Sequence, residues 1–222
     1  MRMALQFAKT GAAKFISHLD LQRAFSRAIR RSGLPVKLSE GFNPHYVISF
    51  ASALSLGMES KCECVEMAMA KDVPADDFLL AMARALPPGL VAKRAVKLRE
   101  GAPKLMAVLA EADYEMPIDP GRSGDFVRAA ESIMAQTQIW AVKVSDGKEK
   151  RIDIRPMIKT VTVREDKLVM RLSAAQTGAL KPDMLLDEME KEAGVFNRAV
   201  KRTALYTVQN GAAVDLLDAL KG

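Results

Sequence analysis

The chain has 222 residues, of which 49% are hydrophobic and 27% are charged, and its formal net charge is +6. This composition is typical of a globular protein with a substantial core. The longest apolar runs fall far short of the roughly 20 residues that a membrane span needs. The N-terminus lacks the apolar segment of a signal peptide, and there are only two cysteines. We therefore expect a cytoplasmic protein with no membrane partner.

The positive charge is concentrated near the N-terminus. Residues 1–60 contain eight Lys and Arg side chains but three Asp and Glu, whereas the rest of the chain is almost balanced. Both histidines of the protein, His18 and His45, lie in the same stretch. A positive field beside two imidazoles favours a site for a polyanion.

The first hundred residues alternate between strand and helix patterns. The clearest element is a helix that begins after a Ser17 N-cap and ends at Gly33, with apolar residues at helical spacing between them. Strands are expected at 1–8, 46–51, 62–70 and 90–99, and a second helix at 74–86. This β-α-β-β-α-β order is that of the split βαβ, or ferredoxin-like, unit.

The pattern then starts again after a linker at residues 100–103. Strands are expected at 105–116, 139–145, 151–157, 160–164, 167–173 and 200–208, and helices at 125–136 and 182–193. The second half thus resembles the first with one extra hairpin, which turns at Asp146 and Gly147. We predict an α+β protein of two tandem ferredoxin-like domains, residues 1–100 and 101–222.

The first helix carries a stripe of arginines opposite its apolar face, and no acidic residue stands four positions away from any of them. The planar guanidinium fork suits phosphate oxygens, so the stripe is a candidate for contact with an RNA backbone. The alternative is an ordinary solvated helix face. The stripe consists of Arg23, Arg27, Arg30 and Arg31.

The loop after this helix is the second candidate for binding. His18 falls at the helix N-terminus, where free backbone N–H groups favour anions. In the loop, Phe42 can stack on a base or anchor the loop in the core, and the amide of Asn43 can contact a polar edge. His45 follows directly. We expect His18, Phe42, Asn43 and His45 to form a recognition pocket beside the arginines.

Two chemical alternatives use the histidines differently. His18 and His45 could act as general acid and base on an RNA 2′-hydroxyl without a metal ion. With Cys62 and Cys64 they also make a formal Cys2His2 set, but the cysteine spacing is typical of core residues on one strand face. Two cysteines are too few to hold an iron–sulfur cluster by themselves. We expect no metal and no cofactor, and a binding protein rather than an enzyme.

The stretch FISHLDLQRAFSRAIRRSGLPVKLSEGFNPHYVISFASALSLGMES at 15–60 resembles the signature of the radical-SAM-linked, or radical-SAM-associated, family of bacterial proteins. Three shorter stretches later in the chain also resemble the family: IDIRPMI at 152–158, GALKP at 178–182 and KRTALY at 201–206. The resemblance implies a partner domain, because members occur fused to or encoded beside a radical SAM protein. This chain has no CxxxCxxC cluster motif of its own.

Together these patterns lead to one expected function and two alternatives. The expected function is an RNA-binding accessory protein that works with a radical SAM enzyme, in modification or processing of ribosomal or transfer RNA. One alternative is the metal-independent endoribonuclease that uses both histidines. The other is a protein-interaction subunit whose arginines bind an acidic partner.

Overall fold

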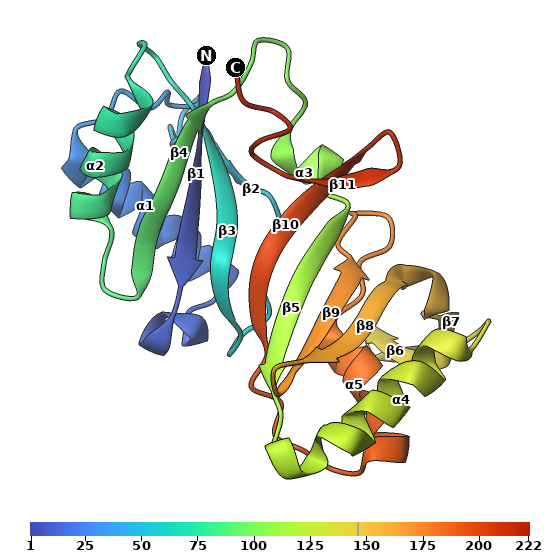
Figure 1. Cartoon of the computed structure of the whole chain (residues 1–222). Coiled ribbons are helices and arrows are strands. Elements are labelled where there is room, and N and C mark those ends of the chain that lie inside the picture. The colour runs from blue at the N-terminus through green and yellow to red at the C-terminus, as the bar shows by residue number, and fades with distance from the viewer. Residues whose placement is uncertain (146) are drawn as a thin grey trace. The chain divides into compact units, whose positions relative to one another are not determined.

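The computed structural model describes residues 1–145 and 147–222 and has the predicted α+β class. The chain divides into two compact units (Figure 1): residues 1–109 with 205–222 form the first, and residues 110–204 form the second. None of the described helices is long and apolar enough to cross a membrane. The tandem ferredoxin-like arrangement and the boundary after residue 100 stay predictions.

The first unit is built on antiparallel strands. Strand β1 (Arg2–Lys9) pairs with β3 (Glu59–Ala68) on one side and with β4 (Leu90–Lys97) on the other. The short strand β2 (Ile48–Phe50) pairs with the side of β3 that faces away from β1. The order is therefore β4-β1-β3-β2, and sequence analysis predicted all four strands to within a few residues.

Helix α1 (His18–Ser32) begins and ends where the sequence signals predict. The Ser17 side chain accepts a hydrogen bond from the Asp20 backbone N–H at 3.1 Å, which satisfies one of the unpaired donors at the helix N-terminus. At the other end Gly33 adopts the left-handed conformation with φ of 68°. The second helix, α2 (Ala75–Ala85), follows Pro74.

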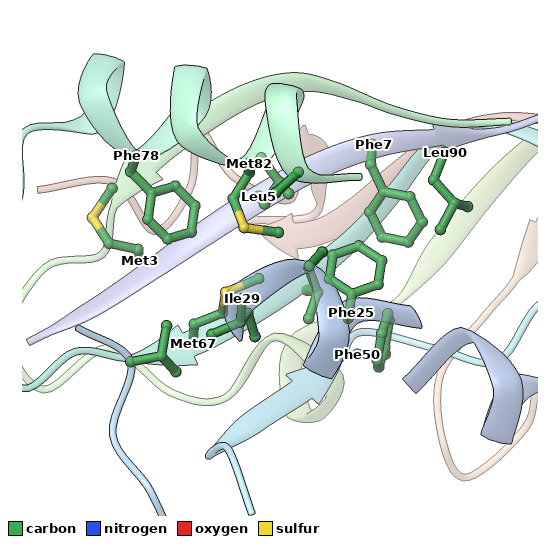
Figure 2. Close-up of a cluster of buried hydrophobic side chains, with 14 of the residues drawn as sticks. Met3, Leu5, Phe7, Phe25, Ile29, Phe50, Met67, Phe78, Met82 and Leu90 are labelled. Carbon is green, nitrogen blue, oxygen red and sulfur yellow. The ribbon is translucent and has the colours of Figure 1, made fainter. Parts of the chain in front are cut away.

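Both helices cover one face of this sheet, and their apolar residues form the core (Figure 2). The Phe25 ring lies 4.8 Å from Phe7 and 5.2 Å from Phe50, measured between ring centroids. Phe78 and Met82 bring α2 into the same cluster. Each large side chain that is fully buried contributes about 1.5–3 kcal/mol, so these contacts hold α1 in place.

Glu66 is a buried charge of this unit that pairs with two cations. Its side chain is 2% exposed, and its carboxylate lies 2.6 Å from the Arg2 guanidinium and 3.2 Å from the Lys104 ammonium. Arg2 also donates to the backbone carbonyl of Ala102. An ion pair from Lys104 and a hydrogen bond to Ala102 therefore hold the segment after β4 against β1 and β3.

A C-terminal segment completes the first unit. Strand β10 (Lys201–Gln209), in which the division between the units falls, turns at Asn210 and Gly211 into β11 (Ala212–Asp215). Beyond it, Asp218 receives a hydrogen bond from Arg94 of β4 and another from Lys221. Arg99 donates to the Ala219 carbonyl at 2.7 Å. Ion pairs and backbone contacts thus fix the last residues to the edge of β4.

The second unit has three antiparallel strands in the order β5-β9-β8. Helix α4 contacts both α5 and β8. An additional hairpin of β6 and β7 forms a sheet of its own. These elements are β5 (Glu111–Pro117), α4 (Ser123–Ala135), β6 (Trp140–Ser145), β7 (Lys148–Asp153), β8 (Ile158–Arg164), β9 (Lys167–Ser173) and α5 (Pro182–Ala193).

Two predicted strands are partly wrong. The expected strand 105–116 begins as the short helix α3 (Leu105–Val108), and only Glu111 starts the strand β5. The expected strand 151–157 ends at Asp153, where Pro156 lies in a 3-10 turn, η3 (Arg155–Met157). Two further 3-10 turns are η1 (Gly11–Phe15) and η2 (Pro120–Arg122). The turn predicted at Asp146 and Gly147 lies in part outside the described residues.

The ion pairs of Asp218 make part of the stability depend on pH. Hydrogen bonds from Arg94, and then from Lys221, lower the pKa of Asp218 from its ordinary 3.8 to about 2. The contribution of ionised Asp218 to the free energy of unfolding is therefore complete above about pH 4 and is lost as the pH falls towards about 2. We expect the free energy of unfolding to fall less steeply over this range in Asp218→Asn than in the wild type, as measured by urea titration. Arg94→Gln should reduce the dependence of the free energy of unfolding on pH in the same way. If the wild type and both variants lose stability in parallel as the pH falls, the role given to the Asp218 ion pairs is contradicted.

Candidate nucleic-acid interface

An open cavity of about 440 Å3 lies between α1 and the loop that follows it. Two residues from the second half of the helix, Arg27 and Arg30, line one side. The other side belongs to the loop, and its lining includes His45. The volume falls within the range of about 300–1,000 Å3 that is usual for sites of small molecules. Residues that sequence analysis assigned to two separate motifs therefore meet at one concave surface.

The helix presents these arginines because its opposite face is buried. Leu21, Phe25 and Ile29 point into the core, whereas Arg27 and Arg30 are exposed. Ser26 also lines the cavity, and its hydroxyl donates to the Gln22 carbonyl at 3.0 Å. Within the part of the chain that the structure describes, neither arginine has an ion-pair partner. Both guanidinium groups are available to an anion.

The loop is a hairpin-like segment that is closed at its base. Leu38 and Tyr46 form an isolated antiparallel bridge, and the Ser39 backbone N–H donates to the His45 carbonyl at 2.7 Å. Gly41, with φ of 116°, allows the sharp turn at the tip. The base of the loop thus has a defined conformation before any ligand binds.

Hydrogen bonds also orient the His45 ring. The Ser39 hydroxyl oxygen accepts the His45 backbone N–H at 3.1 Å and lies 2.9 Å from Nδ1 of the ring. A hydroxyl that already accepts one bond can donate its own proton to Nδ1. In that arrangement the ring proton resides on Nε2, which becomes the donor available to a ligand.

The tip of the loop is fully solvent-exposed. Phe42 has a relative exposure of 105%, and Asn43 is exposed beside it. The core-anchoring interpretation of Phe42 is therefore wrong, because a side chain at this exposure contacts no core residue. Neither residue lines the cavity, but both belong to the loop that forms its wall.

Three other predicted residues lie away from the cavity. Arg23 forms an ion pair with Asp20, three positions before it, at 3.0 Å. Arg31 donates to the Ala85 carbonyl at 2.6 Å, at the C-terminus of α2, and so has a structural role. His18 packs edge-on against Phe50 with 5.3 Å between ring centroids. Arg27 follows His18 by nine residues, roughly 13 Å along the helix axis.

Asp20 joins the helix cap to the arginine stripe. Its pKa is lowered first by the hydrogen bond from the Ser17 hydroxyl and then by the one from Arg23. Spacing at i±4 alone missed this partner, because Asp20 stands at i−3 from Arg23. Arg23 is therefore partly neutralised, and the Asp20 charge also acts on Arg27 without direct contact, whereas the lining of the cavity contains no Asp or Glu.

The cysteines belong to the interior of the first unit. Cys62 and Cys64 are buried on β3 and are not joined in a disulfide, whereas His18 and His45 are exposed. Over residues 1–145 and 147–222, no group of three or more His, Cys, Asp and Glu side chains is arranged to hold a metal ion. The formal Cys2His2 set is therefore not a site in this fold.

Sequence analysis missed part of the cavity lining. Leu38, Pro44 and Tyr46 contribute from the loop, and Ser26 from the helix. Ser26 could have been found from helical spacing, because it stands four positions before Arg30 on the same face. The contribution of Tyr46 depends on its pairing with Leu38, which no local pattern indicates.

Comparison with known proteins places the chain in a family. The model of the family described as "Uncharacterized protein conserved in bacteria (DUF2344)" matches residues 2–182. The chain therefore belongs to this family of bacterial proteins. None of the curated proteins with which the chain was compared matches it.

The orientation of the His45 ring gives a direct test of the loop geometry. We expect the neutral ring to carry its proton on Nε2, because the Ser39 hydroxyl donates to Nδ1. In Ser39→Ala the remaining neighbour of Nδ1 is the Asn43 carbonyl at 3.5 Å, which can only accept. The fraction protonated on Nδ1 should therefore rise, as measured from the imidazole 15N shifts at alkaline pH. The His18 signals serve as the internal control, and an unchanged His45 tautomer would contradict the geometry.

Proposed function

We propose that the protein is a cytoplasmic RNA-binding accessory protein that works with a radical SAM enzyme in modification or processing of ribosomal or transfer RNA. RNA contact is assigned to the surface formed by α1 and the loop at 38–46, here called the basic groove. The groove comprises Arg27, Arg30 and His45 at the cavity and Phe42 and Asn43 at the loop tip. Arg23 extends the positive charge along the helix.

The single observation that carries the proposal is that two arginines with no ion pair among the described residues line a concave surface. An arginine that serves only for solubility can lie anywhere on the surface, with or without a cavity beside it. Here Arg27 and Arg30 line one together with His45, and no carboxylate lines it. Planar guanidinium groups bind phosphate oxygens through two parallel hydrogen bonds, and the imidazole adds a further donor.

The loop tip favours RNA over a free phosphate ion. Phe42 exposes a whole aromatic ring to solvent, close in sequence to the cavity residue His45. Bases of single-stranded RNA stack on exposed aromatic rings while the backbone follows basic side chains. The groove therefore offers both kinds of contact, within one loop and one helix.

The finer fold assignment supports the same proposal. Each unit is proposed to be ferredoxin-like: the order β4-β1-β3-β2 with α1 and α2 on one face is that of a split βαβ unit. In the second unit, β5-β9-β8 with α4 and α5 follows the same scheme with the β6–β7 hairpin added. Sheets of this kind are frequent supports for RNA-binding surfaces, although fold alone assigns no function.

The nuclease alternative receives no support from the geometry. A general acid and a general base must both reach the reacting group, within hydrogen-bond distance or through one water molecule. His45 lines the cavity, whereas His18 lies at the start of α1 against Phe50. The proposal is therefore a binding function without catalysis by this histidine pair.

The principal test compares two charge-matched double variants. Arg27→Ala/Arg30→Ala should weaken binding of a fluorescently labelled single-stranded oligoribonucleotide by on the order of ten-fold or more per arginine. The slope of log K against log salt should fall in magnitude by about two, one for each lost phosphate contact. Fluorescence anisotropy at several salt concentrations measures both quantities.

Lys71→Ala/Lys93→Ala is the control, because it removes the same charge from exposed positions of the first unit that do not line the cavity. It should retain nearly the wild-type affinity. Equal losses of affinity in both double variants would show that binding depends only on net charge and not on the cavity. Absence of binding by the wild type at low salt would refute the proposal.

The radical SAM partner rests on the resemblance of residues 15–60 and has a separate test. We expect tagged protein, purified from bacterial cells after nuclease treatment, to retain a radical SAM protein that mass spectrometry identifies. Retention without nucleic acid is expected for a direct protein contact. A partner that disappears with nuclease would instead be bridged by RNA, and a preparation that never contains one would refute this part of the proposal.

A further inference from the structure

The β6–β7 hairpin has features that the function of the basic groove does not explain. It is a two-stranded sheet of its own in the second unit, drawn in yellow in Figure 1. It carries Trp140, the only tryptophan of the chain, at 49% relative exposure. A large aromatic side chain at half exposure leaves part of its ring in water, where a ligand can contact it.

The tryptophan face also carries a cation. Pairing of β6 with β7 sets Val142 directly opposite Arg151, and Arg151 stands diagonally from Trp140 on the same face. The Arg151 guanidinium lies 5.7 Å from the centroid of the Trp140 ring. Val142 is 52% exposed beside them. This face therefore presents a flat aromatic ring next to a guanidinium group.

The opposite face of the hairpin holds an unfavourable arrangement of charge. Lys143 and Lys150 are directly opposite each other across the two strands, and both are exposed. Like charges at paired positions destabilise an antiparallel pair. Among the described residues neither lysine has an ion-pair partner, and Glu149 forms none with Arg151. This lysine pair faces away from Trp140 and Arg151 and forms no part of their surface.

The base of the hairpin is fixed to its unit, which makes the face a defined surface. Ile139, Ala141 and Ile154 are buried. The Asp153 carboxylate accepts the backbone N–H groups of Ile139 and Arg155 at 2.9 and 3.0 Å. Arg155 donates in turn to the carbonyls of Met134, Gln136 and Ile158. The hairpin thus projects its aromatic and basic residues from a rigid support.

We infer that the β6–β7 hairpin is a second contact site for single-stranded RNA, in which a base stacks on Trp140 and an adjoining phosphate contacts Arg151 on the same face. A stacking aromatic ring beside cations is the general chemistry of single-strand binding. Bases of a duplex are stacked on each other and cannot reach the ring. The inference goes beyond the basic groove and uses no residue of it.

The single tryptophan provides a direct probe of stacking in the full-length protein. Titration with unlabelled oligo(U) should quench the intrinsic fluorescence of Trp140, whereas a duplex RNA of equal charge should quench it far less. Trp140→Leu should weaken binding of labelled oligo(U) by about five-fold to one hundred-fold in fluorescence anisotropy. Trp140→Phe, which keeps a ring, should retain most of the affinity and controls for folding.

Charge variants complete the experiment. Arg151→Gln should lower the affinity, whereas Lys167→Gln, which removes equal charge elsewhere in the second unit, should not. Quenching that is absent, or equal for single strands and duplex, would overturn the inference. So would equal affinity of Trp140→Leu and the wild type.

These experiments can reject either site without rejecting the other. If the hairpin is correct and the basic groove is wrong, Arg27→Ala/Arg30→Ala keeps both the wild-type affinity and the tryptophan quenching. If the groove is correct and the hairpin is wrong, that double variant loses affinity while the wild type shows no quenching. Loss of affinity in both sets of variants, with quenching in the wild type, supports both sites.

Discussion

The contact of Phe25 with Phe7 and Phe50 fixes the rotation of α1 about its axis, and the basic groove depends on that rotation. Successive helix residues are about 100° apart, so with Phe25 directed at the sheet, Arg27 and Arg30 lie roughly 200° and 140° away. The tilted and edge-on contacts of these rings add about 0.5–1.5 kcal/mol each beyond the burial of their area, and so favour this orientation of the helix. A small turn of the helix would carry both guanidinium groups away from the loop at 38–46.

The partners of the arginines distinguish their roles better than their number does. Many of the arginines hold the fold together by donating to backbone carbonyls or carboxylates, and they include Arg2, Arg31, Arg94, Arg99, Arg122 and Arg155. Arg27, Arg30 and Arg151 have no such partner in the described part of the chain. Arg84 and Arg164 lack one in that part of the chain as well, so Arg27 and Arg30 are distinguished by lining a cavity together with the loop at 38–46.

Local signals predicted the elements well, and long-range contacts account for what they missed. Ser17, Gly33 and the apolar spacing between them suffice to define α1. Leu105–Val108 was assigned to a strand because a short apolar run has no distinct period. The β10–β11 hairpin was missed although Asn210-Gly211 is a strong turn signal. Arg27, Arg30 and His45 could be chosen from residue type, but the cavity arises only when the loop pairs with itself, which sequence spacing does not reveal.

The division of the first unit between residues 1–109 and 205–222 bears on how the protein is made. Arg94 and Arg99 are translated more than a hundred residues before their partners Asp218 and Ala219. During synthesis this edge of β4 therefore stays exposed until the C-terminal residues are made. The whole second unit leaves the ribosome, and can fold, before that edge is covered. A shortened chain that stops at residue 182, where the family match ends, would leave that edge permanently open.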